Sequence, residues 1–296
     1  MKKKICIIGA EIDLGAHFRG VKMGPDAIRH THLIPELKEI GYEVEDLGNL
    51  TSDSPSVAGA DNLKYYDDIL KFSRRLARKV SEVIKADAFP VVLGGDHSVG
   101  IGAIAGASEE KIPTGGIFFD AHPDFNTPES TITGNIHGMG TAISVGRGEK
   151  SLVNIQGFSP KLSEHNTVLI GVRDIDPAER KLVAESKMTV FTMSRIDRMG
   201  IDSVMEQAIR IASDGMERVH ISFDMDVLDP REAPAVGYSI NGGLTFREAR
   251  LAMEMLNEAN IVTSLDLSEI NTTLDIQNKT AIIAAELLCF LFGKKY

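Results

Sequence analysis

The middle of the chain contains Gly115-Gly116-Ile117-Phe118-Phe119-Asp120-Ala121-His122-Pro123-Asp124. Its apolar part predicts a short, buried strand of a parallel sheet. After this strand Asp120, His122 and Asp124 occupy alternate positions, and side chains two apart in an extended backbone point to the same face. Carboxylate oxygens and an imidazole nitrogen on one face suit a divalent cation. Taken alone, the stretch is equally compatible with a polar strand end whose aspartates cap a turn.

Two further stretches have the same form. They are Val219-His220-Ile221-Ser222-Phe223-Asp224-Met225-Asp226-Val227-Leu228-Asp229-Pro230 and Pro90-Val91-Val92-Leu93-Gly94-Gly95-Asp96-His97-Ser98. The three stretches together offer six metal-type side chains, namely His97, Asp120, His122, Asp124, Asp224 and Asp226. None of the stretches contains Lys or Arg, so carboxylates that converge there need a bound cation. Six such ligands are too many for one ion and suit two metal ions that share aspartates.

The composition narrows the class of protein. Of the 296 residues, 43% are hydrophobic, which is enough for a sizeable core. The net charge of −10 argues against nucleic acid or an anionic membrane as the principal partner. Cys6 and Cys289, the only cysteines, form no CxxC pair, so we expect neither a disulfide framework nor a thiolate zinc site. The apolar run at residues 5–10 is too short for a signal peptide, and we expect a cytoplasmic protein.

Strand and helix patterns alternate along the chain. Strands are expected at residues 3–9, 42–47, 89–93, 117–119, 167–172, 188–191, directly before Asp224, and at 261–267. Helices are expected at residues 26–40, 63–86, 98–107, from 177 onward, 201–213, after an N-cap at Thr245, and at 276–292. The alternation predicts an α/β protein with one doubly wound, mainly parallel sheet and helices on both faces.

Three segments are predicted loops, at residues 48–61, 125–138 and 230–243. The second is long for a connector and lies beside the expected metal site, which favours a role as a binding lid. No repeat or linker divides the chain, so residues 1–296 are expected to form a single domain. The metal-type residues follow strands, where open α/β sheets gather their ligands. These patterns leave the spatial order of the strands open.

The three motifs resemble the signatures of the ureohydrolase family, which includes arginases and agmatinases. The motifs are Gly94-Gly95-Asp96-His97-Ser98, Asp120-Ala121-His122-Pro123-Asp124 and Ser222-Phe223-Asp224-Met225-Asp226-Val227-Leu228-Asp229-Pro230. The likeness extends from Gly20-Val21-Lys22-Met23-Gly24-Pro25 to the C-terminus, and bacterial arginases are the best match. It implies one catalytic domain of three layers, α/β/α, with about eight strands. It also implies a homotrimer or homohexamer.

The resemblance further implies two Mn²⁺ ions in each subunit. One ion would be held by His97 and Asp124 and the other by His122 and Asp226, with Asp120 and Asp224 bridging them. A hydroxide between the metals would attack the guanidinium carbon of the substrate, and urea and an amine would leave.

Three residues would act on the reacting groups. Asp124 would accept the proton of the hydroxide, and His137 would carry a proton to the leaving amine. Glu269 would hold the guanidinium in a charge-assisted pair. Without the resemblance, His137 is an ordinary loop histidine and Glu269 is one acid after a strand.

The loop after Asp124 resembles the substrate loop of arginases. Asn126, Thr131 and Thr133 would donate hydrogen bonds to the α-carboxylate of L-arginine. Asp176 would bind the α-ammonium group, and Glu179 would reach the same group, directly or through water. Agmatine has no α-carboxylate and would leave these donors unpaired. L-arginine is therefore the favoured substrate.

Three positions depart from the arginase pattern. Val227 stands where glycine is usual, Tyr238-Ser239 stands where Thr-Pro is common, and no proline follows Asn271. None of these changes removes a metal ligand, but Tyr238 is expected to narrow or re-polarise the pocket. Agmatinase activity, or hydrolysis of another guanidino or formimino compound, therefore stays open. A catalytically silent metal- or ligand-binding protein is a further alternative, although the presence of His137 and Glu269 argues against it.

Overall fold

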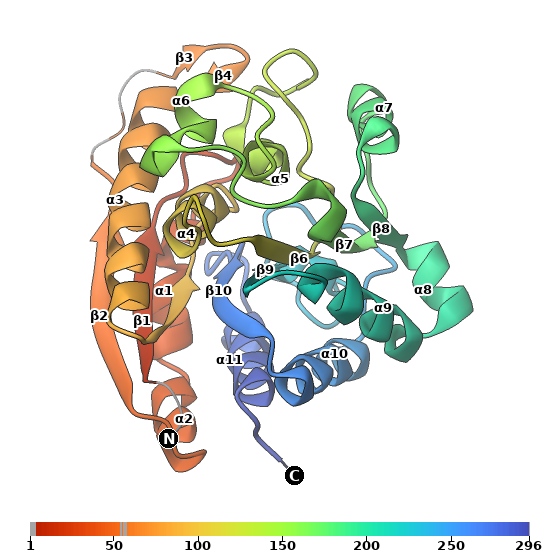
Figure 1. Ribbon diagram of the computed structural model, residues 1–296. Coiled ribbons are helices and arrows are strands. Elements are labelled where there is room, and N and C mark those ends of the chain that lie inside the picture. The colour runs from red at the N-terminus through yellow and green to blue at the C-terminus, as the bar shows by residue number, and fades with distance from the viewer. Residues whose placement is uncertain (1–3, 54, 56–57, 296) are drawn as a thin grey trace.

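The computed structural model describes residues 4–53, 55 and 58–295. An eight-stranded sheet runs through the molecule (Figure 1). Its strands are β1 (Ile5–Glu11), β2 (Val44–Thr51), β5 (Phe89–Leu93), β6 (Thr114–Phe119), β7 (Thr167–Val172), β8 (Thr189–Thr192), β9 (Arg218–Asp224) and β10 (Val262–Ser268). A separate antiparallel pair consists of β3 (Gly59–Ala60) and β4 (Leu63–Lys64).

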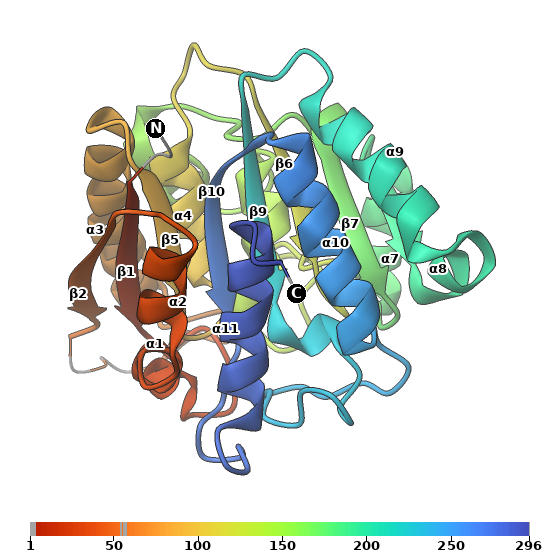
Figure 2. The same ribbon diagram turned by 90° about the horizontal axis from the view of Figure 1, so that it is seen from below.

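The strand pairs of the large sheet are parallel. Their spatial order is β2-β1-β5-β10-β9-β6-β7-β8, and Figure 2 shows this order across the view from β2 to β7. The carboxyl ends of the strands consequently meet at one edge of the sheet. The predicted α/β class and parallel sheet are confirmed, and the structure adds the order, because alternation alone does not fix which earlier strand each crossover returns to.

Helices cover both faces of the sheet. One face is covered by α1 (Gly24–Arg29), α2 (Leu33–Glu39), α8 (Met193–Met199), α9 (Ile201–Ser213), α10 (Phe246–Ala259) and α11 (Lys279–Leu291). The other face carries α3 (Tyr66–Lys85) and α4 (Val99–Ala107). The remaining α-helices of the described residues are α5 (Gly140–Ser144), α6 (Lys150–Val153) and α7 (Pro177–Glu185). The arrangement is the three-layer α/β/α architecture that the sequence predicts.

Successive residues of the central strands face opposite helical layers. In β1, Ile5 and Ile7 join the core cluster of α10 and α11, whereas Cys6 and Ile8 join that of α3 and α4. This period of two follows from the pleat of the strand. Because both faces are buried, these strands have nearly continuous apolar sequences. Among the described residues, no helix has the length and apolar character needed to cross a membrane.

The prediction of one continuous helix over residues 26–40 is wrong. The chain forms α1 and α2 instead, separated by a turn at residues 30–32. The Thr31 hydroxyl donates to the Ile28 carbonyl and accepts from the Leu33 amide, which offers the backbone an alternative to the helix.

The loop predicted over residues 48–61 is too long. Strand β2 continues to Thr51, and β3 occupies two of the later positions, while residues 54, 56 and 57 lie outside the described residues. Residue 3, the predicted start of the first strand, also lies outside them. The sequence patterns do not predict α5, α6 or α8. The first two span five and four residues, which is too short for a helical period to be visible.

Gly171 allows β7 to pass close to the end of β6. Its φ is +101°, and the β7–β8 register shifts at this residue. A Cβ atom here would stand 2.5 Å from Cγ2 of Val227 and 3.1 Å from the carbonyl oxygen of Asp120. Glycine accommodates both the left-handed backbone and the close approach. The valine in place of the usual glycine at position 227 therefore packs against a residue that has no side chain.

We predict that Gly171→Ala lowers the free energy of unfolding by about 2–4 kcal/mol, because backbone strain adds to steric overlap with Val227. Urea denaturation measures the loss. Gly215→Ala is the matched control, since Gly215 has a φ of +70° but nothing within 4 Å of its added Cβ. Val227→Ala removes the overlapping methyl group. In a Val227→Ala background, Gly171→Ala should therefore lower the free energy of unfolding by no more than Gly215→Ala does in the wild type. Equal losses in both single variants would contradict the overlap.

Candidate active site

Five neighbouring strands supply the site residues from their carboxyl ends. In the order of the sheet these strands are β5, β10, β9, β6 and β7. The residues at or just past these ends are His97 after β5, Glu269 after β10, Asp224 as the last residue of β9 and Asp226 after it, Asp120, His122 and Asp124 after β6, and Asp174 and Asp176 after β7. The strand order thus makes positions that are far apart in the sequence adjacent in space.

The backbone after β6 does not stay extended. It bends at residues 121–122, and Asp124 has a left-handed conformation with a φ of +48°. The prediction of a single extended face was therefore wrong in its geometry. The Asp124 carbonyl accepts hydrogen bonds from the amides of Thr141 and Ala142 at 3.0 and 3.3 Å, which holds the turn. The side chains of Asp120, His122 and Asp124 still converge, but through a turn rather than through strand alternation.

The six predicted metal ligands form two adjoining clusters. His97 Nδ1 lies 3.0 Å from Asp120 Oδ2, 2.8 Å from Asp124 Oδ2 and 3.3 Å from Asp224 Oδ2. His122 Nδ1 lies 3.4 Å from Asp120 Oδ1 and 3.0 Å from Asp226 Oδ2. Asp120 belongs to both clusters, with one oxygen toward each histidine. Two groups of three ligand atoms, His97–Asp120–Asp224 and Asp120–His122–Asp226, each lie within 4.8 Å of one another.

The charges of these clusters favour a bound cation. Burial raises the pKa of Asp224 well above its usual range, and the charges of Asp226 and Asp120 raise it further. Burial lowers the pKa of His97, but hydrogen bonds to Asp120 and Asp124 outweigh this effect and hold the pKa well above its ordinary value. Protons on the histidines thus offset the carboxylate charge in the metal-free protein. A metal ion would do so more strongly and would displace those protons.

A buried chain of polar groups orients His97 from behind. His97 Nε2 lies 2.9 Å from Ser222 Oγ, and the Ser222 hydroxyl donates to Asp266 Oδ1 at 3.0 Å. Asp266 Oδ2 in turn lies 2.7 Å from His220 Nε2. Because Ser222 donates to Asp266, it accepts the proton of His97 Nε2, and His97 Nδ1 is the ring nitrogen that faces the carboxylates. These donor atoms therefore fit a metal pair.

The sequence patterns did not predict this chain of polar groups. A signal was nevertheless present, because His220, Ser222 and Asp224 alternate with the apolar residues Val219, Ile221 and Phe223. In a strand that is buried on both faces, such alternation indicates a polar row that runs inward from the carboxyl end. Asp266 on the neighbouring strand completes the row.

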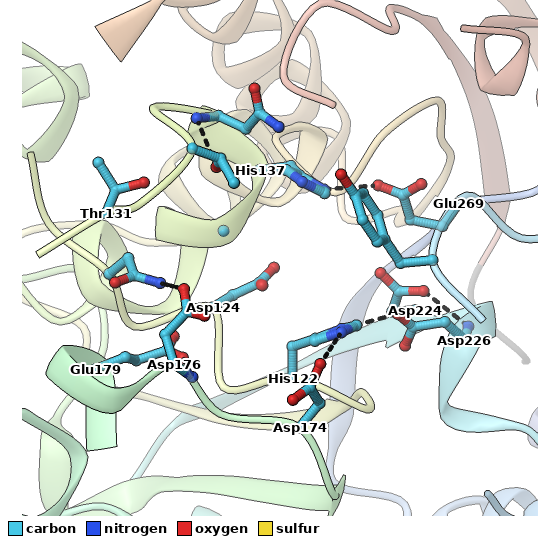
Figure 3. Close-up of a pocket in the computed structure, with 15 residues that line it drawn as sticks. His122, Asp124, Thr131, His137, Asp174, Asp176, Glu179, Asp224, Asp226 and Glu269 are labelled. Atoms are coloured by element: carbon cyan, nitrogen blue, oxygen red, sulfur yellow. Dashed lines mark hydrogen bonds and ion pairs between the residues drawn. The ribbon is translucent and has the colours of Figure 1, made fainter. Parts of the chain in front are cut away.

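A cavity of about 160 Å³ opens above the clusters (Figure 3). Its lining includes all five predicted substrate-binding residues, Asn126, Thr131, Thr133, Asp176 and Glu179, together with the three predicted catalytic residues, Asp124, His137 and Glu269. Asn135 and Asp174 also line it and were not predicted. His97 and Asp120 lie beneath its floor, with 3% and 2% of their surface exposed. The small volume suits a metabolite rather than a larger ligand.

Glu269 lines this cavity and has one unpaired carboxylate oxygen. Its Oε1 accepts a hydrogen bond from the His97 amide at 2.9 Å and lies 3.2 Å from His137 Nδ1 (Figure 3). Its Oε2 is buried and has no hydrogen-bond partner among the described residues. Its backbone has a φ of +68°. An unpaired buried oxygen is costly unless a ligand satisfies it, which points to a cationic group in the cavity.

Comparisons with known proteins agree with this geometry. The model of the arginase family matches residues 3–293. The chain belongs to the arginase family. The arginase of Bacillus subtilis (strain 168) is 47% identical over 295 residues, which cover 100% of this chain and 99% of that protein. The crystal structure of arginase from Bacillus cereus superposes with a TM-score of 0.95 at 44% identity and 99% coverage of both chains.

A more distant arginase shares the fold as well. The crystal structure of Entamoeba histolytica arginase in complex with L-ornithine has a TM-score of 0.90 at 26% identity, with 99% of both chains covered. The ureohydrolase resemblance of the three motifs is thereby confirmed over the full chain.

Two of the positions that depart from the arginase pattern lie away from the cavity. Val227 is fully buried in the core. The Asn271 amide donates to the Ala235 carbonyl, and its side chain bonds Thr273 and the Arg19 carbonyl. Neither residue lines the cavity, whereas Tyr238 does. Of these residues, Tyr238 is therefore the one that lines the cavity.

Glu179 joins the substrate loop to α7. Its carboxylate accepts hydrogen bonds from the amides of Phe125 at 2.6 Å and Asp176 at 3.3 Å, the second as part of a capping box. Burial raises the pKa of Glu179 to about 8, against the effect of these bonds. Asp176 Oδ2 accepts from Asn126 Nδ2 at 3.2 Å (Figure 3). Glu179 therefore fixes the position of the two residues that are predicted to bind the α-amino and α-carboxylate groups.

We predict that His137 titrates near pH 9 in the metal-free protein. Burial lowers the pKa of His137, but the hydrogen bond and charge of Glu269 raise it to about 9. The stabilisation from this pair is full below the ordinary histidine pKa of about 6.5 and is lost as pH rises through 9. In Glu269→Gln this hydrogen bond and charge are lost, while burial and the charges of Asp124 and Asp96 remain, so the His137 pKa should fall.

Proton NMR of the imidazole resonances measures this titration, and His137→Asn assigns the signal. A midpoint that Glu269→Gln leaves unchanged would show that the carboxylate does not hold the proton on His137.

Proposed function

We propose that this chain is a manganese-dependent arginase that hydrolyses L-arginine to L-ornithine and urea. We further propose that residues 1–296 form a single catalytic domain. The observation that carries the proposal is the unpaired, buried oxygen of Glu269, a residue that lines a small cavity together with members of two adjoining carboxylate–histidine clusters. A guanidinium cation paired with that oxygen would lie next to both clusters.

The proposed ligands fit two divalent cations. His97 and Asp124 would hold one ion, His122 and Asp226 the other, and Asp120 and Asp224 would contribute to both. When bound, such ions acidify water and stabilise developing negative charge. Carboxylate and imidazole ligands suit manganese, and they also accept iron or cobalt.

The chain's own residues would orient the substrate and move the protons. Glu269 would pair with the guanidinium and fix its plane. Asp124 lies at the floor of the cavity, where it would take up a proton from the attacking water. His137, which is protonated at neutral pH in the metal-free protein, would deliver a proton to the leaving amine.

The far end of the cavity offers donors for an α-carboxylate. The hydroxyls of Thr131 and Thr133 each accept a hydrogen bond from a backbone amide, of Gly134 at 3.0 Å and of Asn135 at 3.2 Å. Their protons therefore remain available to donate. This pattern supports an amino acid as substrate and argues against agmatine, which would leave the donors unpaired. The E. histolytica arginase crystallised with L-ornithine supports the same choice.

We also propose a cytoplasmic homotrimer or homohexamer without nucleic-acid or membrane partners. The net charge of −10 supports the exclusion of polyanions. Cys6 and Cys289 are free and buried, which fits a reducing compartment. Light scattering of the purified chain would give its oligomeric state.

The first test is urea release from L-arginine and from agmatine by manganese-loaded protein. We predict release from L-arginine and little from agmatine. In Thr133→Val the loss of one hydrogen bond to a charged group should raise KM for L-arginine roughly tenfold and leave the residual agmatine rate unchanged. Thr127→Val is the matched control, because the Thr127 hydroxyl bonds Glu129 within the same loop and does not line the cavity. Release from agmatine alone would overturn the substrate assignment but not the metal site.

We predict that manganese binding releases protons and weakens as the pH falls. The pKa values of His97 and His122 are raised in the metal-free protein, although burial opposes the shift, because neighbouring carboxylates stabilise the protonated rings. Both rings must lose a proton before they can bind metal. Calorimetry in two buffers of different ionisation enthalpy counts the protons that are released.

Metal stoichiometry provides the control for this prediction. The Asp226 carboxylate belongs to the His122 group and not to the His97 group, so Asp226→Asn should leave one tight ion, whereas Asp120→Asn should weaken both. Binding without proton release, or equal stoichiometry in the two variants, would contradict the shared site.

A further inference from the structure

Tyr238 forms part of the cavity wall beside the residues that are proposed to act on the guanidinium. Its ring centroid lies 5.9 Å from that of His137 with an interplanar angle of 35°, and 6.5 Å from that of His122 at 83°. On its other side it meets Phe18 at 5.4 Å and 62°. The ring is thus held among three other rings, while Phe18 remains 47% exposed at the rim.

The unpaired oxygen of Glu269 lies next to the same segment. A Cβ atom added to Gly237 would stand 3.3 Å from Glu269 Oε2. Residues 237–238 therefore border the place where a cation could pair with this carboxylate. The charge of Glu269 also adds to burial in raising the pKa of the Tyr238 hydroxyl, which agrees with their proximity. The wall of the guanidinium subsite on this side is consequently aromatic.

The loop that carries Tyr238 is fixed on both sides. The Arg173 guanidinium donates to the carbonyls of Ile240 at 2.8 Å and of Asp226 at 2.7 Å. It therefore connects the loop to the 3₁₀ turn Met225–Val227, here called the metal-ligand turn because it contains Asp226. The Ala235 carbonyl accepts from the Asn271 amide at 2.8 Å. A wall anchored in this way cannot retreat easily to admit a larger group.

We propose that Tyr238 is a specificity-determining residue, whose ring stacks against an unsubstituted guanidinium and excludes guanidines that carry a substituent on a terminal nitrogen. The proposal rests on the proposed function and adds the class of substrate that the site rejects. The face of a tyrosine ring attracts a planar cation, which would complement the in-plane pairing with Glu269. A methyl group on the terminal nitrogen would instead overlap sterically with the Tyr238 ring or with the rings of His122 and His137 beside it.

The test compares L-arginine with Nω-methyl-L-arginine, whose hydrolysis consumes one water and gives L-ornithine and methylurea. Wild type and Tyr238→Phe, which keeps the ring, should both prefer L-arginine. Tyr238→Thr removes the ring and should lower the preference in kcat/KM by roughly 10–200-fold, the range expected for one methyl group in a tight pocket. The same variant should raise KM for L-arginine roughly two- to thirtyfold through the lost cation–π contact.

The gain of activity on the methylated substrate separates this role from a structural one, because a misfolded variant gains nothing. Phe18→Ala, which removes the packing behind the ring, should shift the preference in the same direction as Tyr238→Thr but less. An unchanged preference in Tyr238→Thr would overturn the proposal, as would a Tyr238→Phe variant that behaves like Tyr238→Thr.

Calorimetry of both ligands with manganese-loaded protein distinguishes this failure from failure of the proposed function. If the wild type binds L-arginine but releases no urea, the proposed function fails, and the ratio of affinities in the same variants still tests the role of Tyr238. A wild type that binds neither ligand would overturn both.

Discussion

The main constraint on the structure is that the mutual repulsion of four buried carboxylates at the carboxyl edge of the sheet must be offset. Asp120, Asp124, Asp224 and Asp226 all have less than a tenth of their surface exposed, and they surround only two imidazoles. Desolvation and like charge both penalise this arrangement, so it persists only with protons or cations among the acids. Asp120 is its centre, because its two oxygens face different histidines.

The fold provides the rigidity that such a cluster requires. Parallel pairing sets β5, β10, β9 and β6 side by side, and helices bury both faces of these strands. Within that core, Ser222, Asp266 and His220 form a hydrogen-bonded polar row, and Ser264 pairs with the remaining ring nitrogen of His220. Buried polar groups are tolerated when they are paired, and this row fixes the ring of His97 from the side away from the cavity.

The loops above the sheet decide which molecule can reach the cluster. Glu179 holds the loop of Asn126 against α7, and Arg173 holds the loop of Tyr238 against the metal-ligand turn. Glu269 connects the metal-type cluster to the cavity wall, since its Oε1 accepts from the His97 amide and also lies 3.2 Å from His137 Nδ1. In this member of the arginase family, hydrogen bonds therefore hold the proposed catalytic and recognition groups in place.

The sequence by itself determined the α/β class, most strand and helix positions and all six metal-type residues, because period, burial and residue chemistry are local properties of the chain. The roles of His137, Glu269 and the substrate loop came from family resemblance, since a single loop histidine or acid has no local signal. Only the tertiary structure decided the strand order, the turn at Asp124 and the backing of His97 by Ser222. It also decided the contact of Tyr238 with His137. These features arise from contacts between residues distant in the chain, which no local pattern records.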